Sequence, residues 1–485
     1  MTVTSTHDGG AAQAVRLRPD WLWTGDELLR APSISLAADG TIAAIAVEGA
    51  AQEGSNTRGA GDAPELRLPS QVLMPGLCDA HSHAFQRAFR GHVQHRRQAD
   101  GTVSADSFWS WRDAMYRVAN VLDPDGVEAV SALAFLELLR AGVTAVGEFH
   151  YLHNQADGTP YTDPDELALR VREAAARVGL RIALLRVVYG AAGIGSDGRP
   201  LPLRDDQRRF GCADAEAGLV ATSRLAARLG ADRFARVGLA VHSVRAVPRS
   251  WLRPLAAWRG QVHAHVAEQP AEVQACHAAF GVGPLQLLAD AGLVHGSFAA
   301  VHLTHPGPND GDLLRSADAS IVVCPSTELD LGDGLLPLAL RARVRLCVGS
   351  DSYAAVEPLA EARTLELHGR AQSGRRVLLG DGSAGGQAAA VLAAASAHGH
   401  HALGLPGGRV CVGAPADLCA VDLDRPEALG VPPLLALSHV ARPEWVRHVW
   451  VGGRHLLRDR RHAEDEAIVR AARVAIDVAL DGPAR

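Results

Sequence analysis

The chain has 485 residues, of which 47% are hydrophobic and 21% charged, and its formal net charge is -6. This composition is typical of a soluble globular protein, and without a basic excess nucleic acid is not expected as a partner. All 48 basic residues are arginine, which excludes a lysine Schiff base and a lysine-derived metal ligand.

The sequence also predicts where the protein resides. The first ten residues lack a charged segment followed by an apolar one, and no apolar stretch reaches membrane-spanning length. We therefore expect neither a signal peptide nor a membrane partner. The seven cysteines are odd in number and form no Cys-x-x-Cys pair, which favours free thiols in a reducing compartment. These features predict a cytoplasmic protein.

Strand-like segments begin the chain, at 14–18, 33–36 and 41–47, with Gly and Asp at the turns between them. From residue 74 to about 404, strand-like runs alternate with helical runs rich in Ala, Leu and Arg, which predicts a parallel α/β domain. The strand-like runs are 142–148, 181–188, 237–242, 261–265, 298–302, 319–324 and 345–351. The chain is long enough for one (β/α)8 barrel and a smaller module.

The strand pattern returns after residue 405, at 410–412, 416–421 and 446–451, and a helix is expected at about 463–479. Because this segment is similar in kind to the N-terminal one, the two ends are expected to form one small β-sandwich. The predicted domains are residues 1–73, the first part of the sandwich; 74–404, the barrel; and 405–485, the second part with the terminal helix.

An apolar, strand-like run ends in His81-Ser-His83. Residues i and i+2 of a strand lie on one face, so both imidazoles can bind one ion. The pair alone is weak evidence, because two histidines at a polar strand end also occur by chance. Later strand-like runs, however, end in His242, His265, His302 and Asp351. The carboxyl ends of barrel strands meet at one face, so these side chains are predicted to lie together.

The predicted metal ligands are His81, His83, His265 and Asp351. His263 shares the strand face of His265 and is the rival ligand, but the spacing to Glu268 favours His265. Glu268 can reach the reacting water without binding the metal and is the predicted general acid/base. His302 is expected to stabilise charge that develops on the substrate, and Asp351 also to accept a proton. Zn²⁺ is the expected cofactor, although such sites also accept Fe²⁺ and other divalent ions.

These motifs resemble the amidohydrolase superfamily, in its mononuclear deaminase branch. The matching segments are 75–83, 265–268, His302 and 349–351. The resemblance implies a (β/α)8 barrel that carries a β-sandwich made from both termini, and a homodimer. Binuclear members bridge their metals with a carboxylated lysine or sometimes a glutamate. A chain without lysine is therefore expected to hold one Zn²⁺ per subunit.

A finer resemblance is to superfamily members that hydrolyse a linear amidine. It is carried by 81–88, 108–116, 148–153, 206–210, 242–247, 265–269 and 327–334. It implies conversion of N-formimino-L-glutamate to N-formyl-L-glutamate and ammonia in histidine degradation. Arginine binds carboxylates bidentately, which suits a small dicarboxylate substrate. The implied substrate-binding residues are Gln86, Arg112, Tyr151, His242 and Arg245. A surface ion pair for Arg112 and a core position for Tyr151 are the alternatives.

The sequence departs from the family pattern after Asp351, where Ser352-Tyr353 replaces an expected Asn and a more polar segment. A tyrosine beside the metal would reshape the pocket, which affects the expected substrate rather than the reaction. Two other functions stay open. A deaminase of a guanidine or an amino-heterocycle would need stacking aromatics, yet aromatic residues make up only 5% of the chain. A non-catalytic barrel is disfavoured by the complete set of ligands and Glu268.

Overall fold

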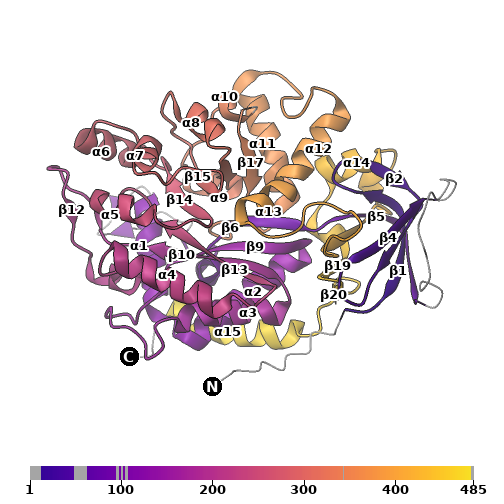
Figure 1. Cartoon of the computed structure of the whole chain (residues 1–485), viewed down its shortest axis with the longest axis horizontal. Coiled ribbons are helices and arrows are strands. Elements are labelled where there is room, and N and C mark those ends of the chain that lie inside the picture. The colour runs from indigo at the N-terminus through magenta and orange to yellow at the C-terminus, as the bar shows by residue number, and fades with distance from the viewer. Residues whose placement is uncertain are drawn as a thin grey trace.

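The computed structural model describes residues 12–47, 63–93, 98–99, 102–103, 108–341 and 343–481. Eight parallel strands form a nearly closed barrel in the order β17-β16-β15-β14-β13-β10-β9-β6 (Figure 1). These strands are β6 (Leu77–Ser82), β9 (Val143–His150), β10 (Arg181–Val188), β13 (Ala235–Val241), β14 (Val262–Val266), β15 (Phe298–His302), β16 (Ser320–Val323) and β17 (Arg345–Val348). An isolated parallel bridge between Ser82 and Asp351 joins the first strand to the last. The barrel expected from the sequence is confirmed.

Helices follow the strands and surround the barrel (Figure 1). They are α1 (Phe108–Val121), α2 (Pro124–Arg140), α3 (Glu166–Val178), α4 (Ala215–Leu229), α5 (Arg249–Leu255), α6 (Pro270–Phe280), α7 (Pro284–Asp290), α8 (Asp310–Ser316), α9 (Pro325–Leu331), α10 (Leu338–Arg341), α11 (Pro358–Ser373), α12 (Ala384–Ala394) and α13 (Ala397–Leu403). Short elements in the connections are η1 (Ala84–Phe89), η2 (Asp205–Phe210), β7 (Gln98–Ala99), β8 (Thr102–Val103), β11 (Gly193–Ile194) and β12 (Pro200–Leu201).

Local sequence explains both kinds of element. Strand β9 is an apolar run buried at every residue, as expected for a parallel strand covered on both faces. Helix α3 buries Leu167, Val171, Ala174 and Val178, spaced three or four residues apart, which turns one apolar stripe toward the barrel. It ends at Gly179, whose φ of 92° is the left-handed conformation that glycine adopts without a steric penalty.

Both ends of the chain contribute to a second, mixed sheet, in the order β20-β19-β18-β5-β1-β3-β4 with β2 paired to β1. Its strands are β1 (Val15–Trp23), β2 (Leu28–Arg30), β3 (Pro32–Leu36), β4 (Ile42–Val47), β5 (Glu65–Pro75), β18 (Leu418–Asp422), β19 (Val446–Val451) and β20 (Arg454–Leu457). This sheet encloses its own apolar cluster, which includes Leu17, Ile34 and Trp450. The small β module expected from both termini is therefore present, and the domain limits at 73 and 404 stay a prediction.

One predicted strand is wrong. Residues 410–412 form no strand, although Val410 is buried and its backbone N–H donates to the carbonyl oxygen of Thr24 at 2.8 Å. The segment between β18 and β19 contains η3 (Pro426–Ala428), α14 (Pro433–Leu435), the π-helical η4 (Ala436–Val440) and η5 (Pro443–Trp445).

Helix α13 covers the amino-terminal end of the barrel. His398 donates from Nδ1 to the carbonyl oxygen of Leu346 at the start of β17, at 2.7 Å. On the opposite side, Nε2 of His263 in β14 donates to the carbonyl oxygen of Ala402 at 3.1 Å. Because β14 lies three strands from β17 and four from β6, α13 spans this end of the barrel. Ala402 packs into an apolar cluster inside the barrel with Ala80, Ala299, Val301, Val322, Cys324 and Cys347.

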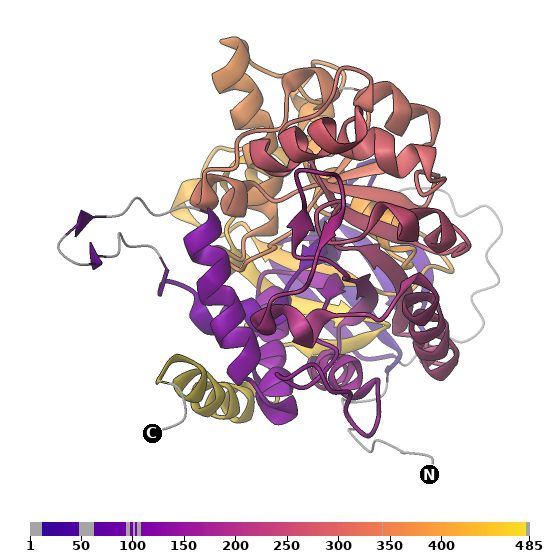
Figure 2. The ribbon, with the colours of Figure 1, turned by 90° about the vertical axis from the view of Figure 1, so that its left-hand side faces the viewer.

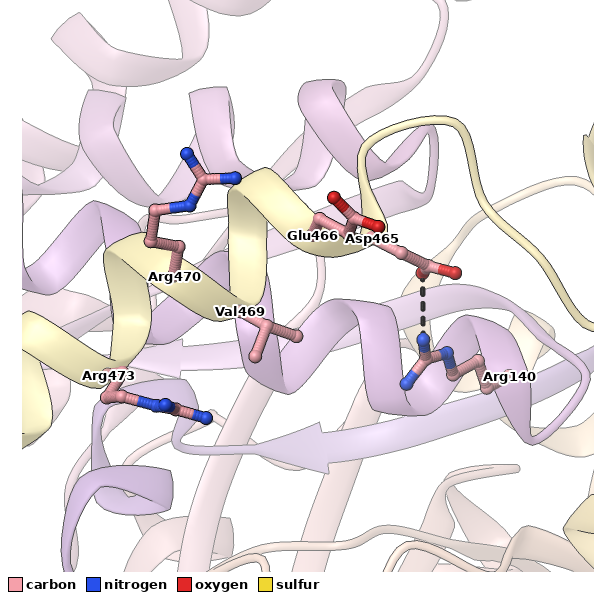
Figure 3. Close-up of a pocket in the computed structure, with 6 residues that line it drawn as sticks. All are labelled: Arg140, Asp465, Glu466, Val469, Arg470 and Arg473. Atoms are coloured by element: carbon pink, nitrogen blue, oxygen red, sulfur yellow. Dashed lines mark ion pairs between the residues drawn. The ribbon is translucent and has the colours of Figure 1, made fainter.

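Helix α15 (Asp465–Asp481) returns the chain to the first helices, and it lies beside α1 and α2 (Figure 2). At its start Asp465 pairs with Arg140 at the end of α2, at 3.0 Å, beside a surface pocket that contains no predicted site residue (Figure 3). Within the described residues, no helix is long and apolar enough to cross a membrane.

Candidate metal centre and active site

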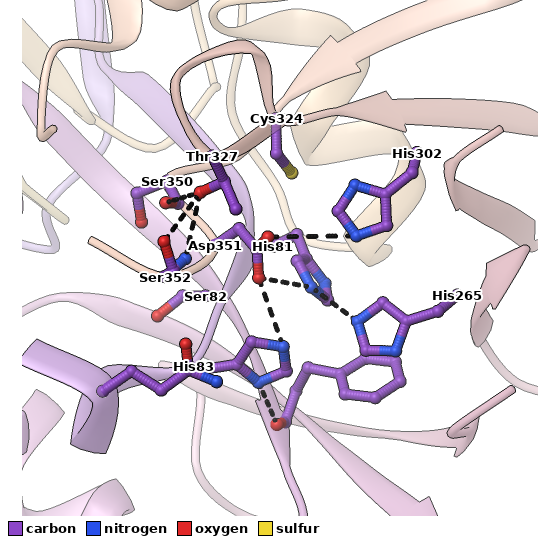
Figure 4. A network of polar contacts seen from close by, with 12 residues as sticks. His81, Ser82, His83, His265, His302, Cys324, Thr327, Ser350, Asp351 and Ser352 are labelled. Carbon is purple, nitrogen blue, oxygen red and sulfur yellow. Dashed lines mark hydrogen bonds and ion pairs between the residues drawn. The ribbon is translucent and has the colours of Figure 1, made fainter. Parts of the chain in front are cut away.

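The candidate site lies at the carboxyl end of the barrel strands. His81 lies in β6 and His83 directly follows it, His265 lies in β14, and Asp351 follows β17 (Figure 4). His302, the last residue of β15, and Asp351 have φ values of 72° and 50°. Such left-handed conformations cost non-glycine residues about 1–3 kcal/mol each and concentrate at functional sites.

Four buried side chains converge on one point. Oδ1 of Asp351 lies 3.4 Å from Nε2 of His81 and 3.3 Å from Nε2 of His83. Nε2 of His265 lies 3.1 Å from Nε2 of His81. None of the four residues is more than 6% exposed. Zinc–ligand bonds of 2.0–2.1 Å in a tetrahedron place the ligand atoms about 3.3 Å apart, so the observed spacing fits a zinc-sized cation.

Hydrogen bonds orient two of these imidazoles. Nδ1 of His83 donates to the carbonyl oxygen of Phe149 at 3.0 Å, and Nδ1 of His265 donates to that of His242 at 2.8 Å. A carbonyl only accepts, so both protons are on Nδ1, and both Nε2 lone pairs face the centre. Backbone carbonyls bonded to the outer nitrogen of a histidine are a regular feature of metal sites.

The protonation states also fit a cation. Burial, together with the nearby His81, lowers the pKa of His83 to about 3. Burial likewise lowers the pKa of His81 and, far more, that of His265. Burial would raise the pKa of Asp351, but its hydrogen bond to His81 and the surrounding histidines outweigh burial and lower it. Neutral imidazoles and an ionised carboxylate are the forms in which these groups bind metals.

Glu268 lies beside this group without belonging to it. Its Oε1 is 3.7 Å from Nε2 of His302, and its Oε2 is 3.4 Å from Nη2 of Arg245. Burial raises the pKa of Glu268, and His302 and Arg245 offset part of that rise. Nε2 of His302 is also 3.9 Å from Oδ2 of Asp351. A carboxylate so placed can exchange protons with a molecule held between Glu268, His302 and the ligand group.

The five predicted substrate-binding residues are linked around the mouth of the barrel, which is the carboxyl end of its strands, where the candidate ligands lie. Gln86 donates from Nε2 to the hydroxyl of Tyr151 at 2.9 Å, and the rings of Tyr151 and His242 lie 5.7 Å apart. The guanidinium groups of Arg112 and Arg245 lie 4.4 and 6.0 Å from the ring of Trp109. Tyr151 is 3% exposed. The guanidinium of Arg112 also lies 5.7 Å from the ring of Tyr116.

Three of these side chains have buried polar atoms without a partner among the described residues, namely Oε1 of Gln86, Nε of Arg112 and Nε of Arg245. An unsatisfied buried polar group costs about 1–3 kcal/mol, and a polar ligand bonded to these atoms would offset that cost. Their position together at the mouth of the site suits a polar ligand that the two arginines and the glutamine would bind.

His263, the rival ligand, lies outside the four-residue group, with its hydrogen bond directed to α13. Tyr353 is fully buried, and its hydroxyl lies 2.8 Å from Oγ of Ser82. The sequence placed Tyr353 beside the pocket, whereas this hydrogen bond directs it to the residue between His81 and His83.

Sequence reasoning assigned no role to two acids that hold the site together. Oε1 of Glu328 lies 3.3 Å from Nδ1 of His302, and Glu148 accepts a 2.6 Å hydrogen bond from Ser82. Both occur in segments that carry the family resemblance, at 327–334 and 148–153. That resemblance was the feature of the sequence that could have pointed to them.

The barrel and the buried His/Asp group together define a metal-dependent hydrolase. The amidohydrolase family model matches residues 72–456, and the chain therefore belongs to the amidohydrolase family.

Three relatives are informative. The chain is 39% identical to formimidoylglutamate deiminase of Pseudomonas aeruginosa over 413 residues. This alignment covers 84% of this chain and 88% of that protein. It is 29% identical to 5-methylthioadenosine/S-adenosylhomocysteine deaminase of Halobacterium salinarum, covering 82% of this chain and 84% of that protein. Among solved structures, an amidohydrolase of Brucella melitensis aligns with a TM-score of 0.84 and 30% identity, covering 96% and 99% of the two chains.

Proposed function

We propose that this amidohydrolase is a zinc-dependent formimidoylglutamate deiminase. It would convert N-formimino-L-glutamate and water into N-formyl-L-glutamate and ammonia, the deiminating step of histidine breakdown. The similarity to the Pseudomonas aeruginosa enzyme supports this substrate. The structural observation that carries the proposal is the set of unpaired buried atoms of Gln86, Arg112 and Arg245 beside Glu268.

His81, His83, His265 and Asp351 are the residues that would hold the cation. When bound, Zn²⁺ supplies Lewis-acid chemistry that activates water near neutral pH. Glu268 accepts a proton as water adds to the formimino carbon, and it delivers that proton to the leaving nitrogen. His302, held by Glu328 on its other nitrogen, stabilises charge on the tetrahedral carbon's oxygen. The C–N bond then breaks and the former amidine nitrogen leaves as ammonia, while the remaining hydroxyl proton of the tetrahedral carbon passes to it by way of Asp351, which gives the formyl group and ammonium.

The substrate's two carboxylates would be bound by the polar residues at the mouth. Arg245 and Arg112 provide guanidinium donors, and Gln86, Tyr151 and His242 provide further polar atoms. Because Arg245 also contacts Glu268 at 3.4 Å, a carboxylate bound by Arg245 places the amidine end of the substrate next to Glu268. This arrangement would hold the reacting carbon close to the residue that moves protons.

The test is ammonia release by the purified zinc-loaded protein from N-formimino-L-glutamate, 5-methylthioadenosine and guanine. We expect kcat/KM for N-formimino-L-glutamate to exceed that for either ring substrate by at least about 10²-fold, because a site built to bind polar groups rejects ligands that lack them. Arg245→Met should raise KM for N-formimino-L-glutamate at least about tenfold. A preference for either ring substrate would contradict the proposal.

A second candidate is deamination of an amino-heterocycle. The observation that favours it is Trp109, whose indole is 39% exposed and lies beneath Arg112 at the same mouth. An exposed indole can stack on a purine ring, and the Halobacterium salinarum relative is named for such substrates. Trp109→Ala should impair only the ring substrates in this case, and the same ammonia assay would detect that.

A further inference from the structure

The candidate ligands depend on the place where the barrel closes. The first strand, β6, contributes His81, and His83 directly follows it, while the segment after the last strand, β17, contributes Asp351. Two backbone hydrogen bonds cross this seam: Asp351 N–H donates to the His81 carbonyl at 2.9 Å, and His83 N–H donates to the Asp351 carbonyl at 3.1 Å. The spacing of three of the four candidate ligands therefore follows from how the two strands meet.

A chain of side chains crosses the same seam. The hydroxyl of Ser82 donates to Oε2 of Glu148 in β9 at 2.6 Å, and its oxygen lies 2.8 Å from the hydroxyl of Tyr353. Ser82 therefore bridges Glu148 and Tyr353. Glu148 also accepts from the backbone N–H of Ala84 at 2.9 Å. The chain thus runs from the segment after β17, through β6, to β9.

Tyr353 is itself held at its backbone. It is fully buried and has a φ of 60°, a conformation that only a well-determined surrounding maintains in a residue of this size. Its carbonyl oxygen accepts a hydrogen bond from Nε of Arg90, and Nη2 of Arg90 pairs with Glu137 at 2.8 Å. The phenol therefore extends from a fixed backbone to Ser82, the residue between His81 and His83.

We propose that Tyr353 is a positioning residue of the metal centre. Through its hydrogen bond to Ser82 it fixes the end of β6 relative to the segment after β17, and so sets the distances from His81 and His83 to Asp351. This inference rests on the metal centre of the proposed function and does not depend on which substrate is used. Groups that orient metal ligands in this way typically contribute 10–100-fold to metal affinity.

The test compares the zinc affinity of metal-free wild-type protein with that of Tyr353→Phe, by competition with a chromophoric chelator. Tyr353→Phe removes one oxygen and keeps the ring, and we expect zinc to bind about 10–100-fold more weakly. The matched control is Tyr161→Phe, a partly buried tyrosine whose hydroxyl lies 3.5 Å from Arg209, and its zinc affinity should equal that of wild type. Cobalt-substituted Tyr353→Phe should also show a changed visible absorption spectrum.

Ser82→Ala and the double variant complete the experiment. If Tyr353 acts through Ser82, the variant with both substitutions binds zinc as tightly as the single variant that has the lower zinc affinity. The inference is overturned if Tyr353→Phe keeps wild-type zinc affinity, if the two effects add, or if wild-type protein binds no zinc. Should Tyr353→Phe fail to fold, an unchanged cobalt spectrum and zinc affinity in folded Ser82→Ala would overturn it equally. Wild-type protein that binds zinc but leaves N-formimino-L-glutamate intact would refute the proposed substrate alone.

Discussion

Glu268 has an oxygen close to each of two cationic side chains, His302 and Arg245, while burial raises its pKa. A carboxyl in this setting can both take and return a proton during one turnover. Glu268→Gln keeps the size and shape of the side chain but removes its ability to take and return a proton. We expect kcat to fall by about 10²–10⁴-fold while the zinc content stays near one per chain.

The measurement is ammonia release together with metal analysis of the same samples. Glu466→Gln, which alters an exposed glutamate on α15, serves as the control and should behave like wild type. Full turnover by Glu268→Gln would remove Glu268 from the mechanism, whereas loss of zinc would show that it holds the metal.

At the residue scale, the sequence predicted the side chains that end strands. The carboxyl ends of parallel strands must meet, and this made His265 and Asp351 predictable as neighbours although 86 positions separate them. The residues that orient the site were not predictable in this way. Ser82 and Tyr353, for example, are 271 positions apart, and their contact depends on how the barrel closes.

Among the elements, β6 and β17 approach each other so closely that Gly349 leaves no space for a side chain. A Cβ at this position would lie 2.6 Å from the carbonyl oxygen of His81 and 2.8 Å from its Cβ. Gly349→Ala must push the two strands apart, and we expect it to lower the free energy of unfolding by about 1–3 kcal/mol. Urea denaturation measures this change.

Gly385→Ala is the matched control, because a Cβ there meets nothing within 4 Å and the residue lies in α12. Alanine is the better helix former, so the control should raise stability by up to about 1 kcal/mol. Equal effects of the two substitutions would show that the seam tolerates a side chain.

Helices α9 and α11 are joined by a buried acid whose ionisation should make stability depend on pH. Glu361 of α11 accepts a 2.9 Å hydrogen bond from the backbone N–H of Ser326 in α9. Burial raises the pKa of Glu361 to about 8 from an ordinary 4.5, despite this bond. The folded state therefore holds a proton that the unfolded state loses between these values, and the associated stability is lost as pH rises from about 4.5 to 8.

Glu361→Gln removes this titration. Compared with wild type, the variant should gain stability as pH rises from 5 to 8, with a difference in slope of at most about 1.4 kcal/mol per pH unit. Urea unfolding at several pH values measures the two slopes. Parallel curves for the two proteins would mean that Glu361 is ionised in the folded state throughout this range.

At this scale, apolar runs predicted the barrel strands because each run is buried on both faces. The same reasoning failed at residues 410–412. There Val410 is buried beneath the terminal sheet. Its N–H donates to the carbonyl oxygen of Thr24, but the segment does not join the regular hydrogen-bond ladder of the sheet. Burial alone does not distinguish a strand from an extended loop, and the partner that decides it lies almost 400 positions away.

In the whole molecule, the barrel and the terminal sheet are connected by a buried ion pair. Arg181, the first residue of β10, donates from Nε and Nη2 to the two oxygens of Asp417 at 2.6 and 3.1 Å. The two side chains are 5% and 1% exposed. Arg181→Met leaves the Asp417 carboxylate buried without its cation, and we expect a loss of about 3–5 kcal/mol in the free energy of unfolding.

The double variant Arg181→Met/Asp417→Leu tests the cause. Removing both charges should restore part of the lost stability, because no ion then remains buried alone. The recovery is expected to be incomplete, since Asp417 also accepts the backbone N–H of Gly452 at 2.6 Å. If the double variant is less stable than Arg181→Met, the loss comes from packing instead of charge.

The alternation of strands and helices made the barrel predictable from the sequence, and the similar character of the two ends made the terminal β module predictable. The helix that covers the amino-terminal end of the barrel was not foreseen, because α13 is short and its role depends on contacts with strands at opposite sides. The homodimer and the cytoplasmic location stay predictions.

The position of α13 determines at which end of the barrel molecules can enter and leave. Helix α13 and the small apolar side chains packed inside the barrel fill its amino-terminal end. Under the function proposed above, cation, substrate, water and both products would therefore enter and leave at the carboxyl end, where Arg112 and Arg245 lie. The positive charge of these arginines would attract the dicarboxylate substrate and, by repulsion, favour the release of ammonium.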